Sequence, residues 1–379
     1  FFGGDSVEKL LMTPGPTNIP NDVFNKMSHN IHHRTGEFDE IYKNVNIKLK
    51  RLFGCKNDLA LLLSSGTGGL EASVVNLFSK GDKLLVLNCG VFGKRFADIA
   101  RIYGVDVHEK IVEWGKGVIE DELRQELEKE KYKAVYATYS ETSTGVKNDI
   151  KKLGQVVKNY DSLFIVDIVS ALGCVEFNAD EFSVDAAIAG SQKGLMCPPG
   201  LSIISLSDRA WEAIYNSTIP KFYFDLKKYK DLNMPYTPGT SLILGLDESL
   251  NIIEHNGIDN IIKRHKRHSD IVKYGCKLMG LKEFPDSRFN SEILTALYVP
   301  EGLSAKEIIK EMSKQGIVIA GGQGKLKGKI IRIGHMGYVK DEYIIKTMKG
   351  LGTSLNTIGY KNDTDNIVKQ IENMLEAQK

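Results

Sequence analysis

Between residues 59 and 206, short apolar runs alternate with segments whose apolar residues recur at helical spacing. Several of these runs are apolar throughout, as strands covered on both faces must be. Such alternation is typical of an α/β domain with a mostly parallel, doubly covered sheet. The runs predicted to be strands cover residues 59–63, 83–88, 105–108, 133–139, 163–169, 185–189 and 201–206.

Helical spacing predicts helices between these strands at residues 70–78, 94–103, 120–130 and 149–159. After a long helical stretch at 242–281, the pattern changes to a small β-α-β-β unit, with segments at 294–299, 304–315, 317–320 and 329–333. Two more helices are predicted at 341–351 and 365–377. Since 379 residues exceed what one core usually holds, we expect a large domain at 21–255 and a small domain at 256–379.

Charge and composition exclude several classes of protein. The 50 Lys and Arg against 48 Asp and Glu leave a formal charge of +2, without the basic surplus of a nucleic-acid-binding protein. No run of about 18 apolar residues is present, so no membrane span is expected, and Phe1–Asp5 lacks the parts of a signal peptide. The five cysteines have neither an even number nor a metal-binding spacing. We therefore expect a reduced, cytoplasmic protein that binds no membrane, nucleic acid or metal.

A parallel sheet binds its ligand beyond the carboxyl ends of its strands, so the residues there are the first site candidates. After the strand at 59–63 comes Ser64-Ser-Gly-Thr-Gly-Gly69, which leads into a helix. Small residues at such a turn leave backbone N–H groups open to a phosphate, with the helix dipole behind them. The turn has neither a Walker A pattern nor G-x-G-x-x-G, and it could equally be a plain connector.

Other predicted strands end in side chains that suit a ligand. Asp167 lies in Phe164-Ile-Val-Asp-Ile-Val-Ser170, where a carboxylate is costly unless it meets a cation or good donors; capping a loop is its alternative role. Phe92, after the strand at 83–88, is either a ring that stacks on a ligand or a packing residue. The hydroxyl-rich segment 140–145 either binds a ligand or simply turns the chain.

Lys193 follows the predicted strand at 185–189, although lysine is among the residues least often buried. A phosphate cradle, a buried carboxylate, an aromatic ring and a desolvated lysine are together what pyridoxal 5'-phosphate (PLP) requires. The lysine amine condenses with the cofactor's aldehyde, and burial lowers the lysine pKa so that neutral amine is available. The carboxylate keeps the pyridine nitrogen protonated.

These residues resemble those of the class V aminotransferases of PLP fold type I, and most of all the alanine–glyoxylate and serine–pyruvate (serine–glyoxylate) aminotransferase branch. The resemblance runs from Met12 to Gly337. Its most specific parts are Pro14-Gly-Pro16, Ser140-Glu-Thr-Ser-Thr-Gly145, Val166-Asp167 and Gly190-Ser-Gln-Lys-Gly194. It implies the large and small domains expected above, an N-terminal segment at 1–20 that reaches the substrate site, and a homodimer with shared active sites.

The resemblance also implies roles for individual residues. Lys193 would form the Schiff base and carry the proton, and Asp167 would pair with the pyridine nitrogen. Arg332 would bind the substrate α-carboxylate, with Gly15 beside it, and Thr142 would also contact the substrate. The other implied cofactor contacts are Ser65, Gly66, Thr67 and Gln192 at the phosphate, Phe92 and Val169 on the two ring faces, Thr142 at the phenolic oxygen, and Thr237 with Tyr236 from the neighbouring subunit.

The implied activity is ping-pong transfer of the amino group of a small L-amino acid, serine or alanine, to pyruvate or glyoxylate. One alternative is a PLP lyase or desulfurase of the same fold. Such enzymes normally have histidine where this chain has Gln192, and a nucleophilic cysteine on a mobile loop, for which Cys197 is too close to Lys193. The other alternative is a non-enzymatic binder of a phosphorylated ligand, which would leave Asp167 without a cation.

Overall fold

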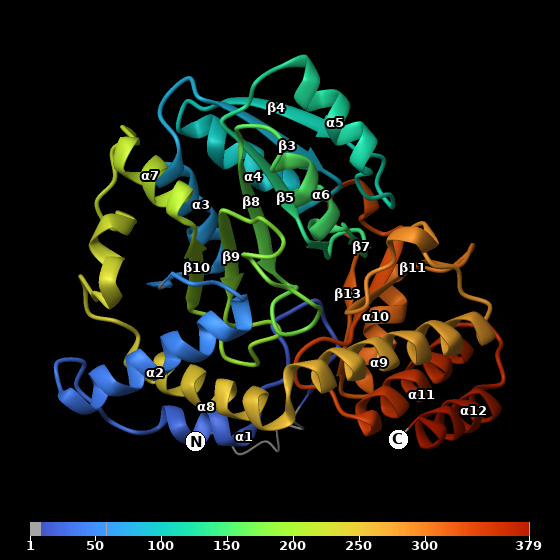
Figure 1. The fold of residues 1–379 in the computed structure, drawn as a ribbon. Helices are drawn as coiled ribbons and strands as arrows, with labels where there is room; N and C mark the ends of the chain where they lie inside the picture. Colours follow the sequence, from blue (N-terminus) through green and yellow to red (C-terminus); the bar gives the residue numbers. More distant parts are fainter. Residues whose placement is uncertain (1–8, 58, 379) are drawn as a thin grey trace.

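The computed structural model describes residues 9–57 and 59–378. Its largest sheet has seven strands in the order β2-β10-β9-β8-β5-β3-β4, and all except β10 run parallel (Figure 1). Each strand overlaps a run predicted from the sequence, so the predicted α/β fold class is confirmed. The strands are β2 Ala60–Leu63, β3 Lys83–Asn88, β4 Asp106–Ile111, β5 Ala134–Thr138, β8 Leu163–Val169, β9 Ala186–Gly190 and β10 Leu201–Leu206.

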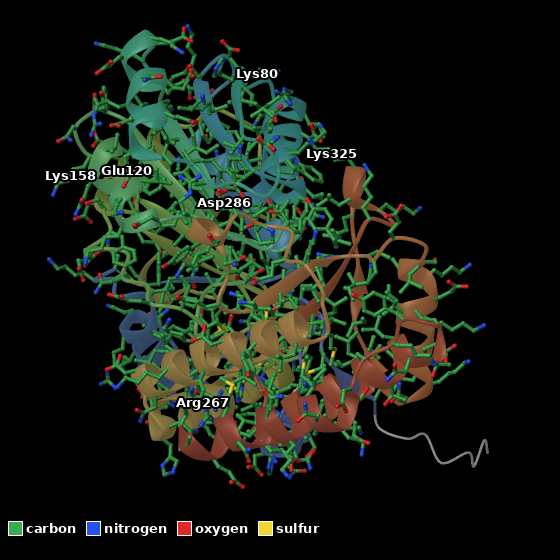
Figure 2. All side chains as sticks on the ribbon, turned by 90° about the vertical axis from the view of Figure 1, so that its right-hand side faces the viewer. Lys80, Glu120, Lys158, Arg267, Asp286 and Lys325 are labelled. Atoms are coloured by element: carbon green, nitrogen blue, oxygen red, sulfur yellow. The ribbon has the colours of Figure 1, made fainter. Side chains whose placement is uncertain are left out.

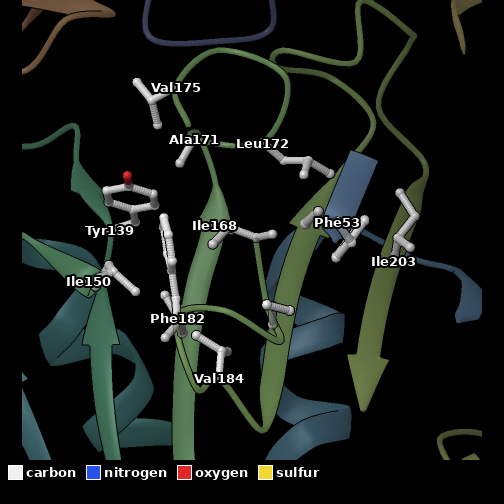
Figure 3. Close-up of a cluster of buried hydrophobic side chains, with 14 of the residues drawn as sticks. Phe53, Tyr139, Ile150, Ile168, Ala171, Leu172, Val175, Phe182, Val184 and Ile203 are labelled. Atoms are coloured by element: carbon white, nitrogen blue, oxygen red, sulfur yellow. The ribbon is translucent and has the colours of Figure 1, made fainter. Parts of the chain in front are cut away.

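Helices cover both faces of this sheet (Figure 1). One face packs against α3 Gly66–Leu77, α4 Val91–Ile102 and α7 Asp208–Asn216. The other packs against α2 Gly36–Phe53, α5 Glu120–Lys129, α6 Ile150–Val157 and α8 Thr240–Asn256. Figure 3 shows part of this second cluster, in which Phe53, Ile150 and Ile168 come from α2, α6 and β8. Burial on both faces explains why these strands are apolar throughout.

The predicted helices between the strands are present, and the sequence patterns did not predict α1 Asn21–Met27, α2 or α7. Local capping defines α2 at both ends. The Thr35 side chain accepts a hydrogen bond from the N–H of Phe38 at the start, and Gly54 ends the helix with a φ of 60°. A left-handed residue there costs glycine little, which makes it the usual residue after a helix.

The long helix predicted at 242–281 is two helices, α8 and α9 Ile258–Leu278, because Gly257 at φ 75° ends α8. Beyond α9, a three-stranded sheet has the order β11-β14-β13. The helices α10 Ala305–Lys314, α11 Asp341–Thr357 and α12 Thr364–Ala377 form a separate apolar cluster with this sheet and α9. The three strands are β11 Leu294–Tyr298, β13 Ala320–Gly321 and β14 Ile330–Gly334.

The N-terminal segment packs against this C-terminal region. Its strand β1 Leu10–Leu11 pairs in parallel with β12 Ile317–Val318, so the single strand predicted at 317–320 is divided between β12 and β13. The helix α1 Asn21–Met27 then contacts α8. Residues 1–8 of the predicted segment 1–20 lie outside the described residues, and the domain division at 20/21 and 255/256 stays a prediction.

Charged side chains such as Lys80, Lys158 and Lys325 are exposed on the outer surface (Figure 2). Within residues 9–57 and 59–378, no helix combines the length and apolar character that a membrane crossing requires.

Candidate active site

Lys193 lies in the turn after β9, where the N-terminal segment closes over its side chain. The residue is 9% exposed, and its Nζ donates a hydrogen bond to the backbone oxygen of Pro14. Gly15 touches the same side chain, since a Cβ added there would lie 2.3 Å from the Cδ of Lys193. The structure therefore brings the predicted residues Gly15 and Lys193 together, and only glycine fits beside the lysine.

Burial lowers the pKa of Lys193 to about 8, although the charge of Asp167 acts in the opposite direction. The nearby cations Arg332 and Arg95 lower it further. At pH 7, roughly one Lys193 side chain in ten then carries a neutral amine, whereas an exposed lysine is almost fully charged. Lys193 is thus suited to nucleophilic attack on an aldehyde.

Asp167 lies near the carboxyl end of β8 and is buried. Its Oδ1 accepts a hydrogen bond from the N–H of Val169 at 2.8 Å, and its Oδ2 accepts one from the hydroxyl of Tyr136 at 3.4 Å. Burial raises the pKa of Asp167 to about 6, while the Val169 N–H and the Lys193 charge oppose the rise. Among the described residues, no cation forms an ion pair with this carboxylate. A protonated ring nitrogen would supply the missing partner.

One cavity of about 220 Å³ joins most of the predicted site. Besides Lys193 and Asp167, its lining includes Ser140, from the hydroxyl-rich segment considered above, and Thr138 and Ser170, which were not predicted. The cavity lies at the carboxyl ends of β2, β5, β8 and β9, as a parallel sheet leads one to expect. The predicted residues that line it are Ser65, Gly66, Thr67, Phe92, Asp167, Val169, Gln192 and Lys193.

The start of α3 forms one end of this cavity and fits a phosphate. The Ser65 side chain caps the helix by accepting the N–H of Gly68, while the N–H groups of Gly66 and Thr67 have no acceptor among the described residues. The buried Oε1 of Gln192 also lacks a hydrogen-bond partner there. Free backbone donors at a helix start attract phosphate oxygens, and the Gln192 amide can rotate to donate as well.

Arg95 lines the same end of the cavity and was not predicted. Its Nη1 donates to Oγ1 of Thr67 at 3.2 Å, and its guanidinium covers one face of the Phe92 ring at 4.8 Å. Arg95 stands three residues after Phe92 on α4, and this spacing puts both side chains on one side of a helix. This three-residue spacing was the sequence signal that could have identified Arg95. The guanidinium lies at the end of the cavity where a phosphate would need a positive charge.

Arg332, on β14, is held with its guanidinium close to the site. Its Nη1 donates to the backbone oxygen of Thr142 at 2.7 Å and its Nε to the backbone oxygen of Gly321 at 2.8 Å. Nη2 has no acceptor in the described part of the chain. The residue is 4% exposed, and burial lowers its pKa to about 10. Arg332 and Thr142 therefore meet through the Thr142 carbonyl, while the substrate role of both residues and the cofactor contact of the Thr142 hydroxyl stay predictions.

Tyr236 and Thr237 do not line the cavity that holds Lys193 in this chain. They line a different, small hollow together with Leu63 and Tyr223. The Tyr236 ring stacks on Tyr223 at 5.0 Å, and its hydroxyl donates to the backbone oxygen of Phe222 at 2.8 Å. The expectation that Thr237 and Tyr236 serve a neighbouring subunit's site stays a prediction.

Comparison with known proteins gives a consistent result. The sequence model of the family described as aminotransferase class-V matches residues 10–336. An uncharacterized aminotransferase of Methanocaldococcus jannaschii is 39% identical over 94% of this chain and 95% of the relative. The serine–glyoxylate aminotransferase of Methylorubrum extorquens is 34% identical over 93% of this chain and 92% of that protein.

A solved structure agrees with the sequence relatives. The ureidoglycine–glyoxylate aminotransferase of Bacillus subtilis superposes with a TM-score of 0.95 and 29% identity, covering 99% of this chain and 100% of that one. The fold is therefore that of the aminotransferases of this family, and the non-enzymatic binding protein considered from the sequence is not supported.

Proposed function

The chain belongs to the class V aminotransferases, and we propose that it uses PLP to transfer the amino group of serine or alanine to pyruvate or glyoxylate. The observation that carries this proposal is that one cavity is lined both by Lys193, buried with a pKa of about 8, and by the carboxylate of Asp167, which has no ion-pair partner among the described residues. The family implies the cofactor, and the residues that line the cavity fit it.

When bound, PLP supplies an aldehyde that condenses with amines and a ring that accepts the electron pair left by the departing α-proton. Ser65, Gly66 and Thr67 would hold its phosphate, with Arg95 neutralising part of the charge. Asp167 would keep a proton on the ring nitrogen through its negative charge, and its two oxygens, which already accept from Val169 and Tyr136, have lone pairs left for this contact. Phe92 and Val169 would flank the ring.

Two residues would handle the amino acid itself. Arg332 would bind the α-carboxylate, since Nη2 has no acceptor among residues 9–57 and 59–378, while the hydrogen bonds of Nε and Nη1 fix the guanidinium plane. Lys193 would take the α-proton on its Nζ and later give that proton up again. Taking the proton requires a neutral amine, and the lowered pKa of Lys193 makes a neutral amine available. The backbone of Pro14 and Gly15 would exclude water from this amine.

Charge at the cavity favours a small donor with one carboxylate. The cations on its lining are Arg95, at the phosphate end, and Lys193. Arg332, which is not on this lining, also lies near the site, since its charge and that of Arg95 act on Lys193. Within the described residues, no further lysine or arginine lines the cavity to bind a second carboxylate, so serine and alanine suit the site better than aspartate.

A panel of amino donors tests this proposal. Holoenzyme incubated with serine, alanine, aspartate and cysteine, each against pyruvate and glyoxylate, is expected to show the largest kcat/KM with serine or alanine. Parallel lines in double-reciprocal plots are expected from the ping-pong order. A clear preference for aspartate would contradict the substrate assignment, and no transamination with any donor would contradict the activity.

A desulfurase of the same fold is the second candidate, and the cysteines argue against it. Such an enzyme needs an accessible thiolate. Burial raises the pKa of Cys89, Cys174 and Cys197 to about 12, and Cys276 is buried as well. Cys55 is partly exposed and lies beyond the end of α2, where its thiol donates a hydrogen bond to the backbone oxygen of Asn57. Release of sulfide from cysteine in the donor panel would favour this second candidate.

The partner assignment follows from Thr237 and Tyr236. Around them the chain exposes large aromatic side chains, with Phe222 74% and Tyr223 38% exposed, and such patches mark interfaces. We therefore expect light scattering to give twice the mass of one chain. Thr237→Ala is expected to weaken PLP binding although Thr237 lies outside the cavity of its own chain. A monomeric holoenzyme with full affinity would contradict the shared site but not the role of Lys193.

A further inference from the structure

Glu141 is a fully buried carboxylate to which the proposed reaction gives no role. It ends β6 Ser140–Glu141, which pairs with β7 Val146–Lys147. Its Oε2 accepts the N–H groups of Phe92 at 3.0 Å and Gly93 at 3.2 Å. Its Oε1 accepts the N–H of Ser143 at 3.2 Å and the hydroxyl of the same residue. All four partners donate, so the site is built for a carboxylate.

The N-terminus of α4 depends on these contacts. The first N–H groups of a helix have no partner within the helix and are usually satisfied by the side chain just before it. In α4 that residue is Gly90, which has no side chain to offer. The N–H of Val91 donates instead to Oγ of Ser143 at 3.0 Å, and those of Phe92 and Gly93 donate to Glu141. A distant loop therefore supplies the cap.

The chain leaves room for this arrangement at Gly90. A Cβ added to Gly90 would lie 2.4 Å from Cδ of Glu141 and 2.5 Å from Oγ of Ser143. Any larger residue before α4 would therefore displace the carboxylate or the hydroxyl that caps the helix. Gly90 has no side chain to cap the helix, and the Glu141 side chain occupies the space that a side chain at position 90 would take.

The same carboxylate connects the parts of the site that face the cofactor and the substrate. The first two turns of α4 carry Phe92 and Arg95, which both line the cavity. The residue after Glu141 is Thr142, whose backbone oxygen accepts the hydrogen bond from Arg332. Moving Glu141 would therefore shift the aromatic ring, the phosphate-side cation and the anchor of Arg332 together.

From this geometry we propose that Glu141 is a positioning residue of the active site, which fixes the ring of Phe92 against the cofactor and the carbonyl of Thr142 under Arg332. Because this inference concerns the position of residues that face the cofactor, it rests on the proposed function. A buried carboxylate is costly unless donors and positive charge surround it. Burial, with the charge of Asp167, raises the pKa of Glu141, and the Ser143 hydroxyl and the N–H groups of Gly93 and Ser143 limit the rise. The positive end of α4 also favours the charged form.

Glu141→Gln tests the inference, because glutamine keeps the size but puts an NH2 group against N–H donors. Titration of the apo-protein with PLP is expected to give a dissociation constant about tenfold or more above that of the wild type. The induced circular dichroism of bound PLP is expected to weaken, and KM for the amino donor to rise, since ring and anchor are no longer fixed. Glu128→Gln, on the exposed side of α5, is the matched control and should leave these values unchanged.

General destabilisation is separated from positioning by a core variant. Ile371→Val, in the C-terminal cluster, is expected to lower Tm without changing PLP affinity or the dichroism. If Glu141→Gln does not fold, Ser143→Ala removes the hydroxyl that accepts the N–H of Val91 and donates to Glu141, and weaker PLP binding is expected there too. Wild-type affinity and dichroism in either variant would overturn the inference. A wild-type protein that binds no PLP would overturn the proposed function instead.

Discussion

Replacement of Lys193 by alanine is expected to abolish the absorbance near about 400 nm that PLP-loaded protein should show and to reduce kcat by about 10⁴-fold or more. The reason is that the variant loses both the amine that condenses with the cofactor and the base that moves the α-proton. Lys193 is the lysine on the cavity lining, and burial has lowered its pKa to about 8. Absorbance spectroscopy and steady-state rates with the best amino donor provide the measurement.

A matched control distinguishes Lys193 from other lysines whose pKa is lowered. Lys221 also has a pKa lowered by burial, but its Nζ donates to Ser217 and to the backbone oxygen of Ile219, away from the cavity. Lys221→Ala is expected to keep the absorbance and the rate. Added methylamine is expected to restore part of the Lys193→Ala activity, since a small amine can enter the space of the lost side chain. A Lys193→Ala protein that stays yellow and active would contradict the assignment.

Asp167→Asn is expected to lower kcat by about 100- to 1000-fold with little change in the fold. Asparagine can still accept the N–H of Val169, but it carries no negative charge to hold a proton on the ring nitrogen. The loss should appear in kcat more than in KM, because Arg332 and not Asp167 is expected to bind the substrate carboxylate. Unchanged kcat in the variant would contradict the role of Asp167.

Asp167→Asn, which is expected to lower kcat, is expected to raise the stability of the apo-protein. The pKa of Asp167 is raised from 3.8 to about 6 by burial, so the folded apo-protein holds this proton more tightly than the unfolded chain. The contribution of Asp167 to the free energy of unfolding is therefore present below about pH 4 and lost as the pH rises through about 6. Relative to the wild type, Asp167→Asn should gain free energy of unfolding across this window in urea titrations. A difference that does not change with pH would contradict the raised pKa.

The fold and the two central residues were predictable because their signals are local. The strands of the central sheet are buried on both faces, so each appears in the sequence as a short apolar run, and each run ends where a site can form. Asp167 lies within an apolar strand and Lys193 follows one. Charged side chains are costly to bury at such positions without a function, so both residues could be recognised as site candidates from the sequence. The Ser65 turn was visible for a similar reason, since its small residues precede a helix.

Residues that act through contacts distant in the chain were not predictable. Glu141 caps a helix that begins some fifty residues earlier, and no pattern around Gly90 shows that its cap comes from elsewhere. Tyr136 sits in a strand as an ordinary buried aromatic, and only the pairing of β5 with β8 brings its hydroxyl to Asp167. The division between β12 and β13 depends likewise on β1, which pairs from the other end of the chain.

The most direct measurement locates the covalent bond between cofactor and protein. PLP-loaded wild-type protein is reduced with sodium borohydride, digested, and searched by mass spectrometry for the pyridoxyl group. We expect the label on Lys193 alone, because this is the amine that burial keeps partly neutral beside Asp167. A label on another lysine, or no label on a protein that binds PLP and transaminates, would contradict the active site described above.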